Sequence, residues 1–152
     1  MIFYRLYEKI ESHSPLGFGN GEGRWNKKGI PLIYSSSSLA LAMLEHYAIK
    51  GSIVSKKTWE VAIIEVHQEI PLLEPLDLPA DWNARPYPQS TLNFGSNWAS
   101  EQVSFCVGVP SIRIPLFRFP EECNLLLNPM HPEFDQNTEI IELKSLDFEI
   151  NV

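Results

Sequence analysis

Three side chains suited to the chemistry of one substrate occur in order along the first third of the sequence. Arg24 follows a glycine-rich stretch, Tyr34 falls in a short apolar run, and Glu45 lies among good helix formers. A guanidinium offers a planar fork of donors for phosphate. A phenol ring stacks on flat heterocycles, and a carboxylate stabilises a developing cation. This order on loop, strand and helix predicts a dinucleotide site with these three residues as its catalytic set.

Glu45 is the least expected of the three. Serines at 35–38 favour a helix start, residues 39–49 favour a helix, and Gly51 supplies a stop. Its helical neighbours, three and four positions away, are all apolar: Leu41, Ala42, Ala48 and Ile49. A carboxylate facing such a stripe needs a partner or a pocket. The segment is equally compatible with a functional carboxylate and with a helix-end glutamate paired to a structural Arg or Lys.

The remaining chemical candidates carry weaker signals. The glycine-rich stretch 17–23 matches neither a Walker loop nor a dinucleotide fingerprint, so it also fits a surface turn. Ser111 lacks a Gly-x-Ser-x-Gly setting, which argues against a hydrolase triad. It fits either a hydroxyl at a pocket rim or a strand end. The four histidines and two cysteines lack metal-ligand spacing, so no metal site is expected.

The elements expected to position these groups are many short strands and few helices. Strands are predicted at 2–7, 31–34, 58–66, 103–109, 112–119, 124–128, 139–143 and 146–150, and helices at 39–49 and 90–102. The proline-rich stretch 71–88 is predicted to be irregular and anchored by Trp82. This pattern predicts an α+β fold.

Length and composition limit the classes of function. A chain of 152 residues with 44% hydrophobic residues predicts one globular domain over 1–152. A net charge of −7 argues against a general binder of nucleic acid or of anionic membranes. Two cysteines do not suggest a disulfide framework, and Cys106 is expected in the core. No signal peptide or membrane-length run occurs, so a cytoplasmic location is expected.

An ordered series of motifs over nearly the whole chain resembles the RES domain, the toxin half of bacterial RES–Xre type II toxin–antitoxin pairs. The motifs are Tyr4-Arg5-Leu6, the run GRWNKKG at 23–29, Tyr34, the run ALAMLE at 40–45, LPADW at 78–82, GSNW at 95–98, VPS at 109–111 and NLLLNPMHP at 124–132. The arginine, glutamate and serine that name the family correspond to Arg24, Glu45 and Ser111. Glu22 departs from the family pattern, where many relatives carry a second glycine.

The resemblance implies a fold like that of ADP-ribosyltransferases, with small packed mixed β-sheets and few helices around an NAD cleft. It implies that NAD is the substrate, not a cofactor, and that its nicotinamide–ribose bond is cleaved by hydrolysis or phosphorolysis. Growth arrest would follow, and an Xre-like helix-turn-helix antitoxin would neutralise the toxin.

Each site residue receives an expected role from this resemblance and from the chemistry of NAD. Glu45 is expected at the ribose hydroxyl and the developing cation, and Arg24 at the phosphates or the adjoining ribose. Tyr34 is expected to stack on nicotinamide, while Ser111 and Asn128 are candidate secondary polar contacts.

Two other functions stay open on the sequence. One is a mono-ADP-ribosyltransferase that modifies a cellular protein. The other is a non-catalytic binding module in which Arg24 and Glu45 form a structural pair. The sequence also leaves open the acceptor of ADP-ribose, the contact surface of the antitoxin and whether the chain forms a homodimer.

Overall fold

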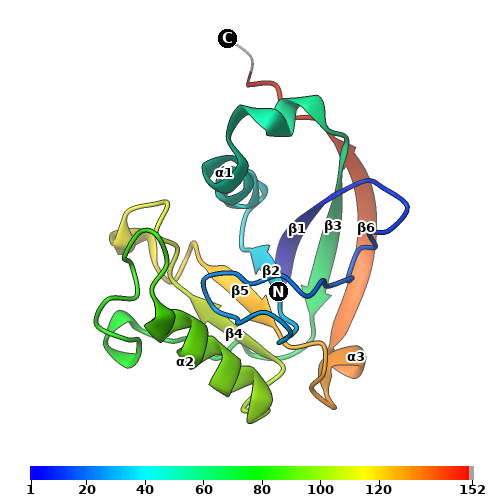
Figure 1. Cartoon of the computed structure of the whole chain (residues 1–152). Helices are drawn as coiled ribbons and strands as arrows, with labels where there is room; N and C mark the ends of the chain where they lie inside the picture. The colour runs from blue at the N-terminus through cyan, green and yellow to red at the C-terminus, as the bar shows by residue number, and fades with distance from the viewer. Residues whose placement is uncertain (151–152) are drawn as a thin grey trace.

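The computed structural model describes residues 1–150; the last two residues of the predicted domain lie outside this range. Its strands and α-helices are β1 (Ile2–Glu8), β2 (Ile33–Ser36), α1 (Leu39–Lys50), β3 (Trp59–Val66), α2 (Gln89–Ser100), β4 (Cys106–Val109), β5 (Asn124–Leu127), α3 (Phe134–Asn137) and β6 (Thr138–Leu146). Short 3-10 helices occur at Gly51–Lys56, Pro75–Asp77 and Leu116–Arg118. Figure 1 shows this arrangement, which confirms the predicted α+β class.

The six strands form one sheet in the order β4-β5-β2-β1-β3-β6. The β1–β3–β6 half is built from long antiparallel ladders, whereas the β2–β5–β4 half has ladders of four residues. A single register pair, Tyr4 with Ser36, joins the two halves. Two halves of one antiparallel sheet thus take the place of the separate mixed sheets that were expected. Figure 1 shows α1 above the junction.

Three apolar clusters hold this arrangement together. The first contains Phe3, Ile64 and Leu125 and spans both halves of the sheet. A second places the α2 residue Trp98 against β4 and β5, and a third places α1 against Trp59 of β3. Removing such side chains from water is the dominant favourable term in folding. Packing of one face of α1 and one face of α2 against the sheet therefore fixes the positions of both helices.

Helix α1 begins and ends where the sequence predicts. Ser38 is its N-cap, and the Ser38 hydroxyl accepts a hydrogen bond of 3.1 Å from the Leu41 backbone N–H. Gly51 ends the helix with φ of 68°, a conformation that favours glycine. Leu41 is buried, but Ile49 is 71% exposed, so the apolar neighbours of Glu45 are buried on one side only.

Two predicted strands are absent from the described residues. The stretch 112–119 contains the 3-10 helix Leu116–Arg118 instead, because Pro115 and Pro120 flank it and proline has no N–H to donate to a ladder. Residues 146–150 do not form a second strand. Leu146 pairs with Trp59, the first residue of β3, so the chain beyond β6 has no strand to pair with.

Strand β4 is shorter than predicted for the same reason. It begins at Cys106 rather than at residue 103, because Cys106 pairs with Leu127, the last residue of β5. The predicted burial of Cys106 and Trp82 is confirmed. Both cysteines are free thiols. Burial raises the pKa of the Cys106 thiol to about 12. Among residues 1–150, the helices are all too short or too polar to cross a bilayer.

Candidate functional site

The Gly23-Arg24-Trp25-Asn26 run forms a tight turn against Tyr34. Gly23 and Asn26 exchange backbone hydrogen bonds of 3.1 and 3.4 Å. The Tyr34 hydroxyl donates to Asn26 Oδ1 at 2.5 Å and accepts from the Trp25 backbone N–H at 3.1 Å. Any Cβ on Gly23 would lie 2.6 Å from the Tyr34 hydroxyl oxygen, so a larger residue there would displace Tyr34 from this network. Burial raises the pKa of Tyr34, which keeps the phenol protonated for this network.

Helix α2 holds the same run from the other side. Trp25 is buried, and a Cβ on Gly95 of α2 would lie 1.8 Å from the Trp25 carbonyl oxygen. The Lys27 backbone N–H donates to Ser96 Oγ at 2.8 Å. These close contacts explain why most of the motif is structural. It fixes a rigid turn from which Arg24 projects.

Arg24 is half-buried and already holds part of the irregular stretch 71–88. Its Nη1 donates to the carbonyl oxygens of Trp82 and Ala84, both at 2.8 Å. Burial lowers the pKa of Arg24, and the charges of Arg113 and Arg85 lower it further, whereas the Glu45 carboxylate raises it. Its other N–H groups form no hydrogen bond within residues 1–150 and are free to bind an anion.

Glu45 lies in a network that the sequence predicts only in part. Its Oε1 accepts from Ser111 Oγ at 2.5 Å and from Asn124 Nδ2 at 2.7 Å. Its Oε2 lies 3.6 Å from Arg113 Nε, and the side chain is 21% exposed. Ser111 therefore contacts Glu45, as the candidate site requires. Oε1 is fully occupied, and Oε2 is the oxygen left for a ligand.

Asn124 and Arg113 are the two members of this network that sequence reasoning missed. Asn124 stands opposite Ser36 in the β2–β5 ladder, and Ser36 Oγ donates to Asn124 Oδ1 at 2.8 Å. That contact turns the Asn124 amide so that its N–H faces Glu45. The register between β2 and β5 was the missing information, because nothing local to Asn124 indicates it.

Asn128 is not part of this group. It follows the far end of β5, about 13 Å along the strand from Asn124 at 3.3 Å per residue. Its side chain is 1% exposed, and its Nδ2 donates to the Ala99 carbonyl oxygen at 3.0 Å while its Oδ1 accepts from the Met130 N–H at 3.1 Å. The amide thus stabilises the turn after β5, and the expected contact of Asn128 with a ligand has no support in its geometry.

Arg24 and Glu45 do not form the structural pair that one interpretation of the sequence proposed. Over the described range no ion pair joins them; Arg24 donates to backbone carbonyls, and the ion pair of Glu45 is with Arg113. Their charges still act on one another. An arginine and a carboxylate that are close but not bonded can each take a ligand group.

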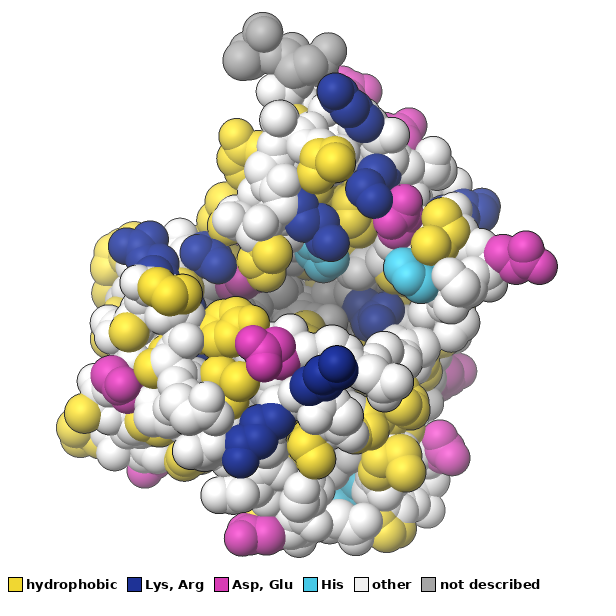
Figure 2. Space-filling model, in the orientation of Figure 1, with side chains coloured by type: hydrophobic (Ala, Val, Ile, Leu, Met, Phe, Trp, Pro, Cys, Tyr) yellow, Lys and Arg dark blue, Asp and Glu magenta, His cyan; other side chains and the backbone are white. Residues whose placement is uncertain are grey.

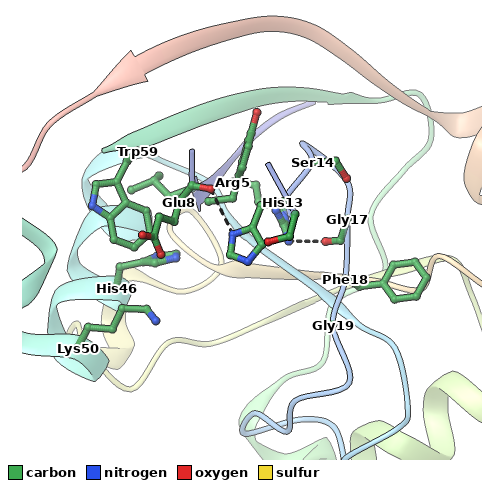
Figure 3. A pocket seen from close by; sticks show the side chains of 13 residues that line it. Arg5, Glu8, His13, Ser14, Gly17, Phe18, Gly19, His46, Lys50 and Trp59 are labelled. Carbon is green, nitrogen blue, oxygen red and sulfur yellow. Dashed lines mark hydrogen bonds between the residues drawn. The ribbon is translucent and has the colours of Figure 1, made fainter. Parts of the chain in front are cut away.

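A cavity of about 620 Å³ lies between β1, α1 and the loop 12–19. Figure 2 shows the hollow in the surface and Figure 3 its walls, which include Arg5, His46, Lys50 and Trp59. Neither Arg24, Tyr34, Glu45 nor Ser111 lines it. Helix α1 connects the two regions, since Glu45 precedes His46 directly.

Arg5 is a cavity residue whose role the sequence did not reveal. Its Nη1 and Nη2 donate to the carbonyl oxygens of Pro15 at 3.2 Å and Gly17 at 2.6 Å, so it holds the glycine-rich loop. Burial lowers its pKa to about 10. The available signal was a lone cation within an otherwise apolar and aromatic strand.

His67 is less isolated than the sequence suggested. Its Nε2 lies 2.9 Å from Glu139 Oε2, and the ligand atoms of Glu65, His67 and Glu139 lie within 4.8 Å of one another. His67 and Glu139 are exposed, and an exposed ion pair of this kind contributes roughly 0–1 kcal/mol. Glu65 lies on β3, His67 directly follows that strand and Glu139 lies on β6, whereas Glu45 lies on α1.

The fold and the site define an α+β domain that holds a hydrogen-bonded glutamate among arginines. Residues 2–150 match the RES domain, and the chain therefore belongs to the RES domain family. It is 36% identical to "Toxin Res" of Yersinia enterocolitica, with 98% of this chain and 97% of that protein aligned. It is 34% identical to "Toxin Res" of Photorhabdus laumondii, with 99% and 95% aligned.

Two further comparisons concern the activity of a relative and the fold. The "Prs ADP-ribosylating toxin" of Sphingobium sp. is 37% identical over 73% of this chain and 68% of that protein. The crystal structure of the M. tuberculosis MbcT–MbcA toxin–antitoxin complex contains a chain of similar fold, with a TM-score of 0.70 and 17% identity over 96% of this chain and 84% of that one. The sequence-based identification of a RES domain is thereby confirmed.

Proposed function

We propose that this chain is the toxin of a toxin–antitoxin pair and that it degrades NAD by cleaving the nicotinamide–ribose bond. The observation that carries the proposal is the setting of Glu45. Ser111 and Asn124 fix one carboxylate oxygen, and the other stands free beside Arg113 and within the field of Arg24. The toxins among its relatives support the biological role.

The geometry suits the chemistry of this bond. When the bond breaks, its electron pair goes to the pyridinium nitrogen, and nicotinamide leaves as a neutral molecule without a general acid. The ribose is left as an oxocarbenium-like cation, which water or phosphate then captures. A fixed carboxylate stabilises that charge with little reorganisation, and Glu45 Oε2 is the oxygen available for it and for a ribose hydroxyl.

The distribution of arginine supports a substrate with two phosphates. The chain has a net charge of −7, yet Arg85 and Arg113 lie near enough to Arg24 to lower its pKa, and Arg5 lines the cavity. The cavity volume falls within the range of roughly 300–1,000 Å³ typical of ligand sites. In this proposal Arg24 binds the phosphates, the exposed ring of Tyr34 stacks on nicotinamide, and the cavity takes the adenosine half.

A second candidate is transfer of ADP-ribose to a protein. It is favoured by the 37% identity to a relative named as an ADP-ribosylating toxin. The same bond would break and the same groups would act, so the two candidates differ only in the acceptor.

The decisive experiment is incubation of the purified, antitoxin-free chain with NAD, with and without phosphate, followed by mass spectrometry of the products. We expect nicotinamide together with ADP-ribose or its 1-phosphate. Complete retention of NAD at high concentrations of folded protein would reject the proposal. Labelling of a defined protein by radiolabelled NAD in a lysate would favour transfer instead.

The matched variants for this experiment are Arg24→Ala and Arg118→Ala. Arg24 reaches the site, whereas Arg118 is exposed and pairs with Glu122 at 2.7 Å in a local i,i+4 contact. We expect growth arrest on expression of the chain to vanish with Arg24→Ala and to persist with Arg118→Ala. Persistent arrest with both variants would mean that toxicity does not arise at Arg24.

We further propose that a helix-turn-helix antitoxin neutralises the chain by blocking the site. The similarity of its fold to a chain of a toxin–antitoxin complex fits this role. An inhibitor carboxylate would imitate phosphate at the free N–H groups of Arg24. Co-expression and purification of the complex, followed by NAD binding, tests the idea. Undiminished NAD affinity in a stable complex would point to inhibition elsewhere.

A further inference from the structure

His46 is held in one orientation on the wall of the cavity. Its Nδ1 lies 3.1 Å from the Ala42 carbonyl oxygen, one turn earlier in α1. Its ring meets Trp59 edge-on, with centroids 5.2 Å apart and planes at 78°. Figure 3 shows the imidazole on the cavity wall with Trp59 and Lys50. The Nδ1 contact and the packing against Trp59 together restrict rotation of the ring.

The surroundings of His46 also determine which nitrogen carries the proton. Burial is the largest influence and lowers the pKa of His46. The Ala42 hydrogen bond opposes it, the charges of Lys50 on α1 and Arg5 on β1 lower the pKa further, and Glu45 raises it least. Tyr7, Glu8 and His13 are the other titratable groups that line the cavity. A carbonyl oxygen only accepts, so the neutral ring carries its hydrogen on Nδ1. Nε2 is left with a lone pair.

Nε2 belongs to a side chain that lines the cavity, and it is accessible to a ligand there. Among residues 1–150, no group forms a hydrogen bond with Nε2. Nε2 is also not one of the fully buried polar atoms without a partner, so it is accessible. The two cations on the same wall, Arg5 and Lys50, attract phosphate but cannot accept a hydrogen bond. The cavity therefore combines positive charge with one fixed neutral acceptor.

We propose that His46 is a specificity-determining residue that accepts a hydrogen bond at Nε2 from a hydroxyl of the adenosine ribose. This inference rests on the proposed cleavage of NAD and adds the group that recognises the half of the substrate remote from the reacting bond. A hydroxyl donates to Nε2, whereas a deoxy position has nothing to donate. A 2′-phosphate has no proton to offer at neutral pH.

Two substitutions of His46 separate the role of Nε2 as an acceptor from the contact of Nδ1 with Ala42. In His46→Asn the amide N–H occupies the place of Nδ1 and retains the Ala42 contact, but Nε2 is lost. In His46→Gln the amide reaches the place of Nε2 and restores an acceptor. We expect KM for NAD to rise about tenfold in the Asn variant, the scale of one hydrogen bond, with kcat little changed and with partial recovery in the Gln variant. His67→Asn is the matched control, because His67 directly follows β3 and does not line the cavity.

Analogues of NAD with a 2′- or 3′-deoxy adenosine ribose complete a double-mutant cycle. We expect the wild-type chain to lose about tenfold in kcat/KM with one of the two analogues, and His46→Asn to show no further loss with it. Equal losses in both proteins, or an unchanged KM in His46→Asn, would overturn the inference. NAD cleavage by the wild-type chain would survive either result, so the two proposals fail separately.

A measurement on the wild-type protein covers the case in which the Asn variant does not fold. We expect addition of ADP-ribose to shift the ¹⁵N resonance of His46 Nε2 while Nδ1 keeps the signature of a protonated nitrogen. Saturation with ADP-ribose that leaves Nε2 unperturbed would overturn the inference. So would an Nε2 that already carries the proton in the free protein at neutral pH.

Discussion

The β1–β3–β6 half of the sheet and the β2–β5–β4 half differ in length and in what they contribute. The long half pairs over seven and eight residues, and β1 and β3 place apolar side chains such as Ile64 in the core. The short half pairs over four residues, and polar groups occur along its strands and just past their ends: Tyr34, Ser36, Ser111 and Asn124. Helix α1 lies over the junction and directs Glu45 to one side and His46 to the other.

The difference suggests that stability and chemistry reside largely in different halves. The long β1–β3 ladder buries apolar side chains along both strands, whereas the short strands end close together and bring polar side chains to one place. Substitutions in the long half should then change unfolding more than turnover. Those at the ends of the short half should do the reverse.

The largest expected effect is on turnover at Glu45. Glu45→Gln retains size and hydrogen bonding but removes the charge that stabilises the sugar cation, so kcat for NAD should fall about a hundredfold to a thousandfold. Nicotinamide release measures the loss, and thermal unfolding should change little. Glu122→Gln, at an exposed pair, is the control. A large drop in melting temperature would mean that Glu45 stabilises the fold, which would contradict the proposed separation of stability from chemistry.

The next effect, at Gly95, combines a loss of stability with a change in NAD binding. A methyl group there would lie 1.8 Å from the Trp25 carbonyl oxygen, so Gly95→Ala must displace the turn that carries Arg24. We expect a loss of about 1–3 kcal/mol in unfolding free energy together with a raised KM for NAD. Gly21→Ala, where a Cβ meets nothing within 4 Å, is the control. Normal KM in the Gly95 variant would show that the turn does not position Arg24.

A smaller effect tests the long half alone. Ile64 of β3 is fully buried, and Ile64→Val should reduce the unfolding free energy by about 0.5–1.5 kcal/mol through the lost methylene. Chemical denaturation measures this change, and kcat and KM should match those of the wild type. Altered kinetics in a folded Ile64→Val protein would contradict the separation of stability from chemistry.

The smallest expected effect is the pH dependence of stability at His46. Its pKa in the folded protein is lowered, so the unfolded chain takes up the proton first as the pH falls. Stability is therefore complete above the ordinary histidine value of about 6.5 and declines as the pH drops towards the lowered value. Denaturation at pH 7 and pH 5 should show a shallower decline in His46→Asn. An identical decline would remove His46 as its source.

Local signals in the sequence predicted much of the fold. Most failures concerned contacts between residues that are far apart in the sequence. Ser38 and Gly51 bound α1 because capping depends on neighbouring residues alone. Asn124 was missed because its contact with Glu45 depends on the register of β5 against β2, and the buried contacts of Asn128 depend on the packing of α2. The contact of Ser111 with Glu45 joins residues 66 positions apart, and only the ordered motifs indicated it.

Because Glu45 and His46 are adjacent in α1, an insertion or deletion before them would change the direction of both side chains. Successive helical residues point about 100° apart, at 3.6 residues per turn, and each of these two side chains meets a different surface. Deleting one residue between Ser38 and Glu45 would turn His46 towards Ser111 and Asn124 and carry Tyr47 towards the cavity. Loops elsewhere tolerate insertions and deletions. This helix should not, and homologous chains should therefore preserve the distance from the serine cap to the glutamate.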